Sequence, residues 1–293
     1  MSIIKLAPSV KCYNWGGEKL RERFGLQTDK KVAQSWVLSA LEGRESELIT
    51  SKYAGMLFSE YLKAAPAGVL GTKGEKYPVF PLTVKFSDNQ ENSIVQVNPD
   101  TDRSSLWYVV GAGENSVIYF GMADEITQVE LLAALSSGNL GQYLRAVPVK
   151  AGSVFRVDPG IVYAYGSDVQ LLEMDVEAPE REMSREEVLG GISLQPVEQD
   201  FALGAWAADG EIHRAEIGEN SVFKAELIDL NGRMDLDADT FSFKALVFLE
   251  GSAVLERDDE ILHAEPGDAF FVEAETPVWH VTGNAQLALI SLV

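Results

Sequence analysis

The chain has 293 residues, 46% of them hydrophobic, and a formal net charge of −21 at pH 7. The hydrophobic share is large enough for a sizeable core, which excludes an intrinsically disordered chain. The excess of acidic residues repels nucleic acid and anionic membrane surfaces, so neither is an expected partner. No apolar stretch reaches the roughly 18 residues of a membrane span. The first residues also lack the layout of a signal peptide, so we expect a cytoplasmic protein.

Few segments carry a helical pattern. Residues 18–24 and 56–64 are short candidates, and the clearest helix begins at Thr127, which forms a capping box with Glu130 and precedes a hydrophobic run that stops at Gly138. Most of the remaining chain is rich in Val, Ile, Tyr and Phe and is interrupted by turn residues. Strands are expected within residues 106–120, 153–157, 169–174, 243–254 and 269–272. The pattern predicts an all-β sandwich or barrel with a small helical insertion.

Two segments of the chain echo each other. Residues 149–157 and 264–272 each contain a glycine, Gly152 or Gly267, followed at the same spacing by a phenylalanine, Phe155 or Phe270. A repeated turn-and-strand unit indicates two related β-barrel halves. The strand pattern breaks over residues 195–208. We therefore predict an N-terminal domain with short helices over residues 1–200 and a C-terminal β domain over residues 201–293.

Several motifs occur in the order and at the spacing found in one known family. A turn runs from Gly152 through Asp158, Pro159 and Gly160 to Tyr163, in the frame of a cupin motif. Further matching segments are NWGG at 14–17, SWVLSA at 35–40, PLTVKFSD at 81–88 and SIVQVNPD at 93–100. Over nearly its whole length the chain resembles the type I mannose-6-phosphate isomerases of the cupin superfamily. The resemblance implies an all-β bicupin built from jelly-roll barrels.

The resemblance also implies where a catalytic zinc ion would be held. Family members use, in chain order, a glutamine, a histidine, a glutamate and a second histidine. The corresponding positions of this chain carry, in the same order, Gln96, Asn98, Ser105 and Tyr163. Amide, hydroxyl and phenol groups are poor zinc ligands beside imidazole and carboxylate. We therefore expect no zinc at full occupancy. A harder ion such as magnesium or calcium could instead use nearby acidic oxygens. The acidic residues in question are Asp100, Asp102, Glu173 and Asp175.

Two basic residues implied by the resemblance remain. Lys85 stands where the family has an active-site lysine, and Arg103 stands where it has a second one. Either could hold a phosphate or a sugar oxygen. Alternatively, each forms a salt bridge, Lys85 with Asp88 and Arg103 with Asp102. Because the frame around Tyr163 is preserved, its side chain is expected to point into the former metal position. Lys85, Arg103 and Tyr163 are therefore the expected substrate-binding residues.

Three functions stay open. The first is a homologue in carbohydrate metabolism that binds a sugar or sugar phosphate and is weakly active or inactive. The alternative is a working mannose-6-phosphate isomerase, which interconverts mannose 6-phosphate and fructose 6-phosphate, with a variant metal site. The third is a structural or interaction module whose barrel is plugged by aromatic side chains. Trp15 and Trp107 are expected in the core. No residue is assigned a catalytic role, and the oligomeric state is left open.

Overall fold

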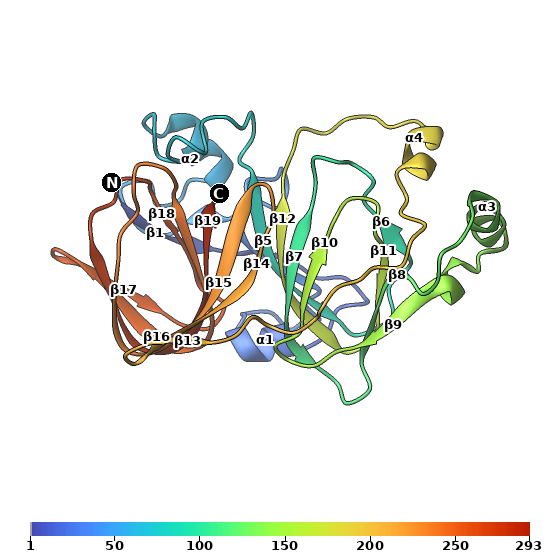
Figure 1. Ribbon diagram of the computed structural model, residues 1–293. Coiled ribbons are helices and arrows are strands. Elements are labelled where there is room, and N and C mark those ends of the chain that lie inside the picture. The colour runs from blue at the N-terminus through green and yellow to red at the C-terminus, as the bar shows by residue number, and fades with distance from the viewer. Residues whose placement is uncertain (1) are drawn as a thin grey trace.

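Antiparallel strands are the main regular structure of the computed structural model, which describes residues 2–293. The predicted all-β class is therefore confirmed. Figure 1 shows two lobes, with the C-terminal strands in one and the strands from the middle of the chain in the other. Among the helices of residues 2–293, none has the length and apolar character needed to cross a lipid bilayer.

The C-terminal lobe is built on a nine-stranded sheet in the order β13-β14-β15-β19-β16-β18-β1-β4, with β17 paired to β16. Its strands are β1 (Ile3–Ala7), β4 (Glu47–Leu48), β13 (Ala207–Asp209), β14 (Ile212–Glu219), β15 (Phe223–Leu236), β16 (Lys244–Arg257), β17 (Glu260–Ala264), β18 (Ala269–Val272) and β19 (Trp279–Leu292). Two of them come from the start of the chain. Ile3 of β1 pairs with Val272 of β18, and Leu6 of β1 pairs with Leu48 of β4. The first residues thus join the C-terminal sheet, and the division at residue 200 stays a prediction.

The other lobe contains a six-stranded sheet in the order β10-β7-β12-β5-β3-β2 and a four-stranded sheet in the order β6-β11-β8-β9. The six-stranded sheet has β2 (Ser9–Lys11), β3 (Gln34–Leu38), β5 (Leu82–Asn89), β7 (Ser105–Ala112), β10 (Val154–Val157) and β12 (Val169–Val176). The four-stranded sheet has β6 (Gln96–Val97), β8 (Val117–Met122), β9 (Leu144–Pro148) and β11 (Val162–Tyr165). Successive side chains of a strand point to opposite faces. In β12, Leu172 and Met174 therefore enter the core, whereas Glu173 and Asp175 face a cavity.

The expected helices are present and short. They are α1 (Lys19–Phe24), α2 (Phe58–Ala64) and α3 (Gln128–Ser137). Thr127 and Glu130 form the predicted capping box of α3, and Gly138 ends that helix in a left-handed conformation. The sequence pattern does not predict η1 (Leu140–Tyr143), a 3-10 helix, or α4 (Arg185–Gly190). Helix α4 buries no residue, so it lacks the apolar periodicity from which helices are recognised.

The segment 106–120 is a hairpin rather than one strand. Strand β7 ends at Ala112 and β8 begins at Val117. Within the turn, the Ser116 N–H donates a hydrogen bond to the Gly113 carbonyl at 3.2 Å. The Gly113 N–H in turn donates to the carbonyl of Asp168 at 2.9 Å. The sequence signal for this break is the glycine-rich run at residues 111–115, which is typical of a turn.

The internal repeat is present in the backbone. Gly152 and Gly267 both have a φ of +90°, and each lies just before a strand, β10 or β18. The Gly152 N–H donates to the Val109 carbonyl at 2.9 Å, and the Gly267 N–H donates to the Phe248 carbonyl at 2.8 Å. A positive φ of this size favours glycine, because a side chain would be strained there. The two halves therefore use the same turn to start equivalent strands.

The two lobes share a hydrophobic core. Its largest cluster joins Val84 and Phe86 of β5 to Ile4 of β1 and Phe271 of β18. A second cluster lies among the strands of the other lobe and includes Trp107, which is 1% exposed. The prediction that Trp107 lies in the core is confirmed. Because one cluster spans both lobes, the strands that carry the polar cavity are fixed against the C-terminal sheet.

Candidate functional site

A cavity of about 650 Å³ is lined by residues of β5, β7 and β12 on one side and of β6 and β11 on the other. Its volume is in the range of small-molecule sites. The six residues singled out from the sequence all line it, namely Lys85, Gln96, Asn98, Arg103, Ser105 and Tyr163. Their role in binding stays a prediction. An open cavity argues against a barrel plugged by aromatic side chains.

Strand register brings distant residues together on the floor of the cavity. Glu173 of β12 lies directly across from Lys85 of β5. On its other side β12 pairs with β7, where Asp175 lies across from Ser105. Cross-strand neighbours in an antiparallel sheet have Cβ atoms only about 5 Å apart, so their side chains interact. A row of charged and hydroxyl groups therefore runs across three adjacent strands.

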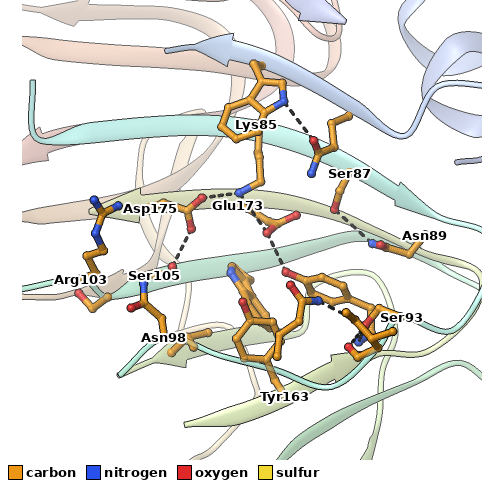
Figure 2. A pocket seen from close by; sticks show the side chains of 18 of the residues that line it. Lys85, Ser87, Asn89, Ser93, Asn98, Arg103, Ser105, Tyr163, Glu173 and Asp175 are labelled. Atoms are coloured by element: carbon orange, nitrogen blue, oxygen red, sulfur yellow. Dashed lines mark hydrogen bonds and ion pairs between the residues drawn. The ribbon is translucent and has the colours of Figure 1, made fainter. Parts of the chain in front are cut away.

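Lys85 is buried between two carboxylates (Figure 2). Its Nζ forms an ion pair with Asp175 and lies 3.3 Å from Glu173 Oε2. Burial by itself lowers the pKa of the Lys85 ammonium, but Asp175 and Glu173 outweigh it and raise that pKa above its ordinary value. Lys85 is thus a permanent cation. The alternative of a salt bridge with Asp88 is wrong, because Asp88 instead accepts the backbone N–H of Lys19 at 2.9 Å.

The two carboxylates also accept hydrogen bonds from hydroxyl groups. Ser105 Oγ donates to Asp175 Oδ1 at 2.6 Å, and the Tyr165 hydroxyl donates to Glu173 Oε2 at 2.9 Å. Figure 2 shows the Ser105 bond continuing the contacts of Lys85, and the Tyr165 bond extends the same network at Glu173. Buried polar groups that satisfy one another in this way are held rigidly. The floor of the cavity is therefore preorganised.

Arg103 is the second cation of the cavity, and it too is paired. One guanidinium nitrogen lies 3.1 Å from Glu177 Oε2, and another donates to the Ala178 carbonyl at 2.5 Å. Asp100 Oδ2 lies 3.7 Å from its Nε. Burial is the main cause that raises the pKa of Glu177, with the nearby Asp175 adding to it. The alternative of a salt bridge for Arg103 is correct, but the partners are Glu177 and Asp100 rather than Asp102.

The remaining family positions, Gln96 and Asn98, lie on the opposite wall. Gln96 is half-buried on β6, and its Nε2 lies 3.4 Å from Ser93 Oγ. Asn98 is exposed, and its Oδ1 accepts the Asp100 N–H at 3.1 Å. Such a side-chain bond two residues along the chain is characteristic of an Asx turn. Asn98 therefore has a local structural role.

Tyr163 lies on β11, across the cavity from Glu173 (Figure 2). Its ring packs edge-on against Trp107, with ring centroids 4.8 Å apart at 80°. Burial, and then the negative charges of Glu173 and Asp175, raise the pKa of the Tyr163 phenol to about 12. The phenol is therefore neutral at physiological pH. It can donate a hydrogen bond to a ligand but does not present an anionic oxygen.

This raised pKa predicts a loss of stability at alkaline pH. The unfolded phenol has a pKa of about 10. Tyr163 therefore stabilises the folded chain fully below about pH 10, and this contribution is lost as the pH rises towards about 12. Urea denaturation between these pH values should give a shallower decline for Tyr163→Phe than for the wild type. Parallel declines would mean that the phenol is not shielded.

Known proteins share this architecture. A family model described as the mannose-6-phosphate isomerase cupin domain matches residues 211–292. YvyI of Bacillus subtilis (strain 168), a relative named for mannose-6-phosphate isomerase, is 26% identical over 98% of both chains. The mannose-6-phosphate isomerase of Streptococcus mutans is 31% identical over 54% of this chain and 52% of its own. The crystal structure of the Bacillus subtilis mannose 6-phosphate isomerase matches with a TM-score of 0.88 at 22% identity, covering 99% of each chain. Residues 211–292 thus match a mannose-6-phosphate isomerase cupin domain, and the whole chain is similar to proteins named for that enzyme.

The residues at the positions that the resemblance assigns to the metal do not fit zinc. They offer two amides, a hydroxyl and the neutral phenol of Tyr163. Within residues 2–293, no group of three or more His, Cys, Asp or Glu side chains is placed to hold a metal. Three of the four carboxylates considered for magnesium or calcium are engaged otherwise. Glu173 and Asp175 are paired with Lys85, and Asp100 lies 3.4 Å from Arg181.

Some residues of the cavity wall do not follow from the sequence pattern. Trp15 is expected in the core but is half-buried, lines the cavity and stacks on Tyr13 with ring centroids 5.7 Å apart. It lies in a loop before α1 rather than in a strand, so no alternation marks its face. Trp36 and Arg44 also line the cavity, with the Arg44 guanidinium 4.8 Å from the Trp36 ring centroid. Arg44 follows β3 in a turn, and no local signal marks it.

Proposed function

We propose that the protein binds a sugar or a sugar phosphate in this cavity and is a weakly active or inactive homologue of mannose-6-phosphate isomerase. The observation that carries the proposal is an open cavity with an ordered polar floor, in which the family's metal positions bear neutral donors. The names of the relatives favour mannose 6-phosphate as the ligand, and fructose 6-phosphate follows as its ketose isomer. Consistent with this metabolic role, a cytoplasmic location is part of the proposal.

The groups of the cavity suit a carbohydrate. The rings of Trp15 and Tyr163, both half-buried, offer aromatic surfaces for the apolar face of a sugar ring. Glu173 and Asp175 offer carboxylate oxygens that accept hydrogen bonds from sugar hydroxyls. Because these carboxylates are already oriented by Lys85 and by hydroxyl donors, binding requires little reorganisation. The cavity thus favours ligands with many hydroxyl groups.

Isomerisation of such a ligand asks for more than binding. Moving a proton between C1 and C2 of the open-chain sugar creates an enediolate, whose negative charge a Lewis acid stabilises. The cations nearest to the floor are Lys85 and Arg103, and both are already paired with carboxylates. Paired cations offer less positive potential to a developing oxyanion. Each 1.4 kcal/mol of lost stabilisation slows the reaction about tenfold, so the expected activity is low.

Calorimetry and a coupled isomerase assay on the same preparation test this proposal. We expect mannose 6-phosphate or fructose 6-phosphate to bind, and turnover to stay at least about 1,000-fold below that of the Bacillus subtilis isomerase assayed in parallel, with zinc, cobalt, magnesium or manganese added. Turnover that a chelator abolishes would instead support the alternative, a working isomerase with a variant metal site. If neither sugar phosphate nor neutral sugar binds, the binding function itself is refuted.

A further inference from the structure

Some of the charged side chains that line the cavity have a partner of opposite charge, and others do not. Acidic residues outnumber basic ones among the lining side chains. Of the basic residues, Lys85 is paired with Asp175 and Glu173, and Arg103 is paired with Glu177. A phosphate placed on the floor would therefore meet carboxylates beside each cation. Like charges at contact distance in a partly buried site repel strongly, so the floor disfavours an anion.

Arg44 differs from these two cations. No carboxylate of residues 2–293 lies within 4.0 Å of its guanidinium nitrogens. Its side chain is exposed and is held over the Trp36 ring at 4.8 Å, and the two residues line the cavity together. Stacking on an aromatic face restricts the guanidinium without using its hydrogen-bond donors. Arg44 thus offers a free and oriented fork of donors at the solvent side of the cavity.

The Trp36 indole also connects Arg44 to the floor. Lys85 Nζ lies 5.0 Å from the Trp36 ring centroid, so one aromatic side chain contacts both the buried cation and the exposed one. Trp36 itself is only 5% exposed, so a ligand lies beside it in the cavity, where it can reach the polar floor with one end and Arg44 with the other. The wall is therefore polar at the floor and cationic at the exposed side.

Building on the proposed function, we propose that Arg44, stacked on Trp36, is the phosphate subsite of the cavity. The ligand is a sugar phosphate whose ring lies between the floor and Arg44, whose hydroxyls face Glu173 and Asp175, and whose phosphate is held by Arg44. A planar guanidinium matches two phosphate oxygens with two parallel hydrogen bonds. Lys85 and Arg103, the cations that the sequence suggests for phosphate, instead keep the floor carboxylates in place.

Titration calorimetry with mannose 6-phosphate and with mannose tests this subsite. In the wild type we expect mannose 6-phosphate to bind about tenfold more tightly than mannose, because a charge-assisted bond to phosphate adds to the sugar contacts. Arg44→Met should abolish that preference while leaving the affinity for mannose unchanged. Arg44→Lys should keep part of the preference, since it retains the charge without the fork. Raising the salt concentration should weaken only phosphate binding.

Arg145→Met provides the matched control. Arg145 is an exposed arginine that also stacks on an aromatic ring, that of Phe201 at 5.4 Å, but it does not line the cavity. This variant should bind both ligands as the wild type does. An unchanged phosphate preference in Arg44→Met, or an equal loss of affinity for both ligands, would overturn the subsite and leave the proposed function standing. If the wild type binds neither ligand, the proposed function fails and the subsite fails with it.

Discussion

The triple variant Asn98→His, Ser105→Glu, Tyr163→His is expected to bind zinc with a dissociation constant below about 1 µM, which corresponds to about 8 kcal/mol. Together with Gln96, the new side chains supply the imidazole and carboxylate donors that zinc prefers. Structural zinc sites reach about 10–16 kcal/mol, so even an imperfect arrangement should exceed this threshold. Competition with a fluorescent zinc chelator measures the affinity, and elemental analysis of the purified variant measures the metal content.

The wild type and the double variant Asn98→His, Tyr163→His are the controls for zinc binding. The double variant lacks the new carboxylate and should have an intermediate affinity. Without metal, the triple variant should be less stable than the wild type by roughly 1–3 kcal/mol, because Ser105 gives up its hydrogen bond to Asp175 and a further carboxylate enters the site. Zinc should restore the melting temperature. A folded triple variant that gains no metal would show that these positions are not equivalent to the ligands of the family.

Replacing Lys85 with Met is expected to lower the free energy of unfolding by about 3–5 kcal/mol. Lys85 is 8% exposed and is the cation that both Glu173 and Asp175 contact. Its removal leaves two carboxylates close together without their common partner, and this costs far more than the lost attraction alone. Urea denaturation at neutral pH, compared with the wild type, measures the change.

Two variants make the Lys85 result specific. Lys150→Met removes an exposed lysine and should change the free energy of unfolding by less than about 0.5 kcal/mol. The double variant Lys85→Met, Asp175→Asn should recover part of the lost stability, because it removes one of the stranded charges. A loss below about 1 kcal/mol in Lys85→Met would show that water, and not the lysine, compensates the two carboxylates.

Much of the fold follows from local patterns. The capping box at Thr127 and Glu130 and the stop at Gly138 mark α3 because helix ends are satisfied by nearby residues. The repeated glycines Gly152 and Gly267 mark equivalent turns, since both positions need a positive φ. Helix α4 and the hairpin between β7 and β8 are harder to predict. Helix α4 has no buried residue, so no apolar pattern marks it. The hairpin turn is short, and the strands before and after it are both rich in buried apolar residues, so they resemble one continuous strand.

The candidate site is predictable in part. The family motifs point to residues between Lys85 and Tyr163 in the sequence, and the fold places these residues around one cavity. Their interactions do not follow from the motifs. Acidic neighbours in sequence, Asp88 and Asp102, suggest the salt bridges, whereas Lys85 pairs with Asp175 and Arg103 pairs with Glu177. Charge pairing depends on distance in space, and strand register sets that distance.

The amino-acid sequence alone determines the chemistry of the donors. An amide at Asn98, a hydroxyl at Ser105 and a phenol at Tyr163 are weak zinc ligands in any fold. The reason is that the affinity of a group for zinc depends on its own charge and polarisability, which the residue type fixes. Only the tertiary structure decides which charges are free. The pairing of β12 with β5 places the Lys85 ammonium beside carboxylates, which neutralise its charge. The turn after β3 instead places Arg44 on Trp36, where it has no acidic partner in residues 2–293. Partners of this kind are distant in sequence, and folding alone brings them within reach.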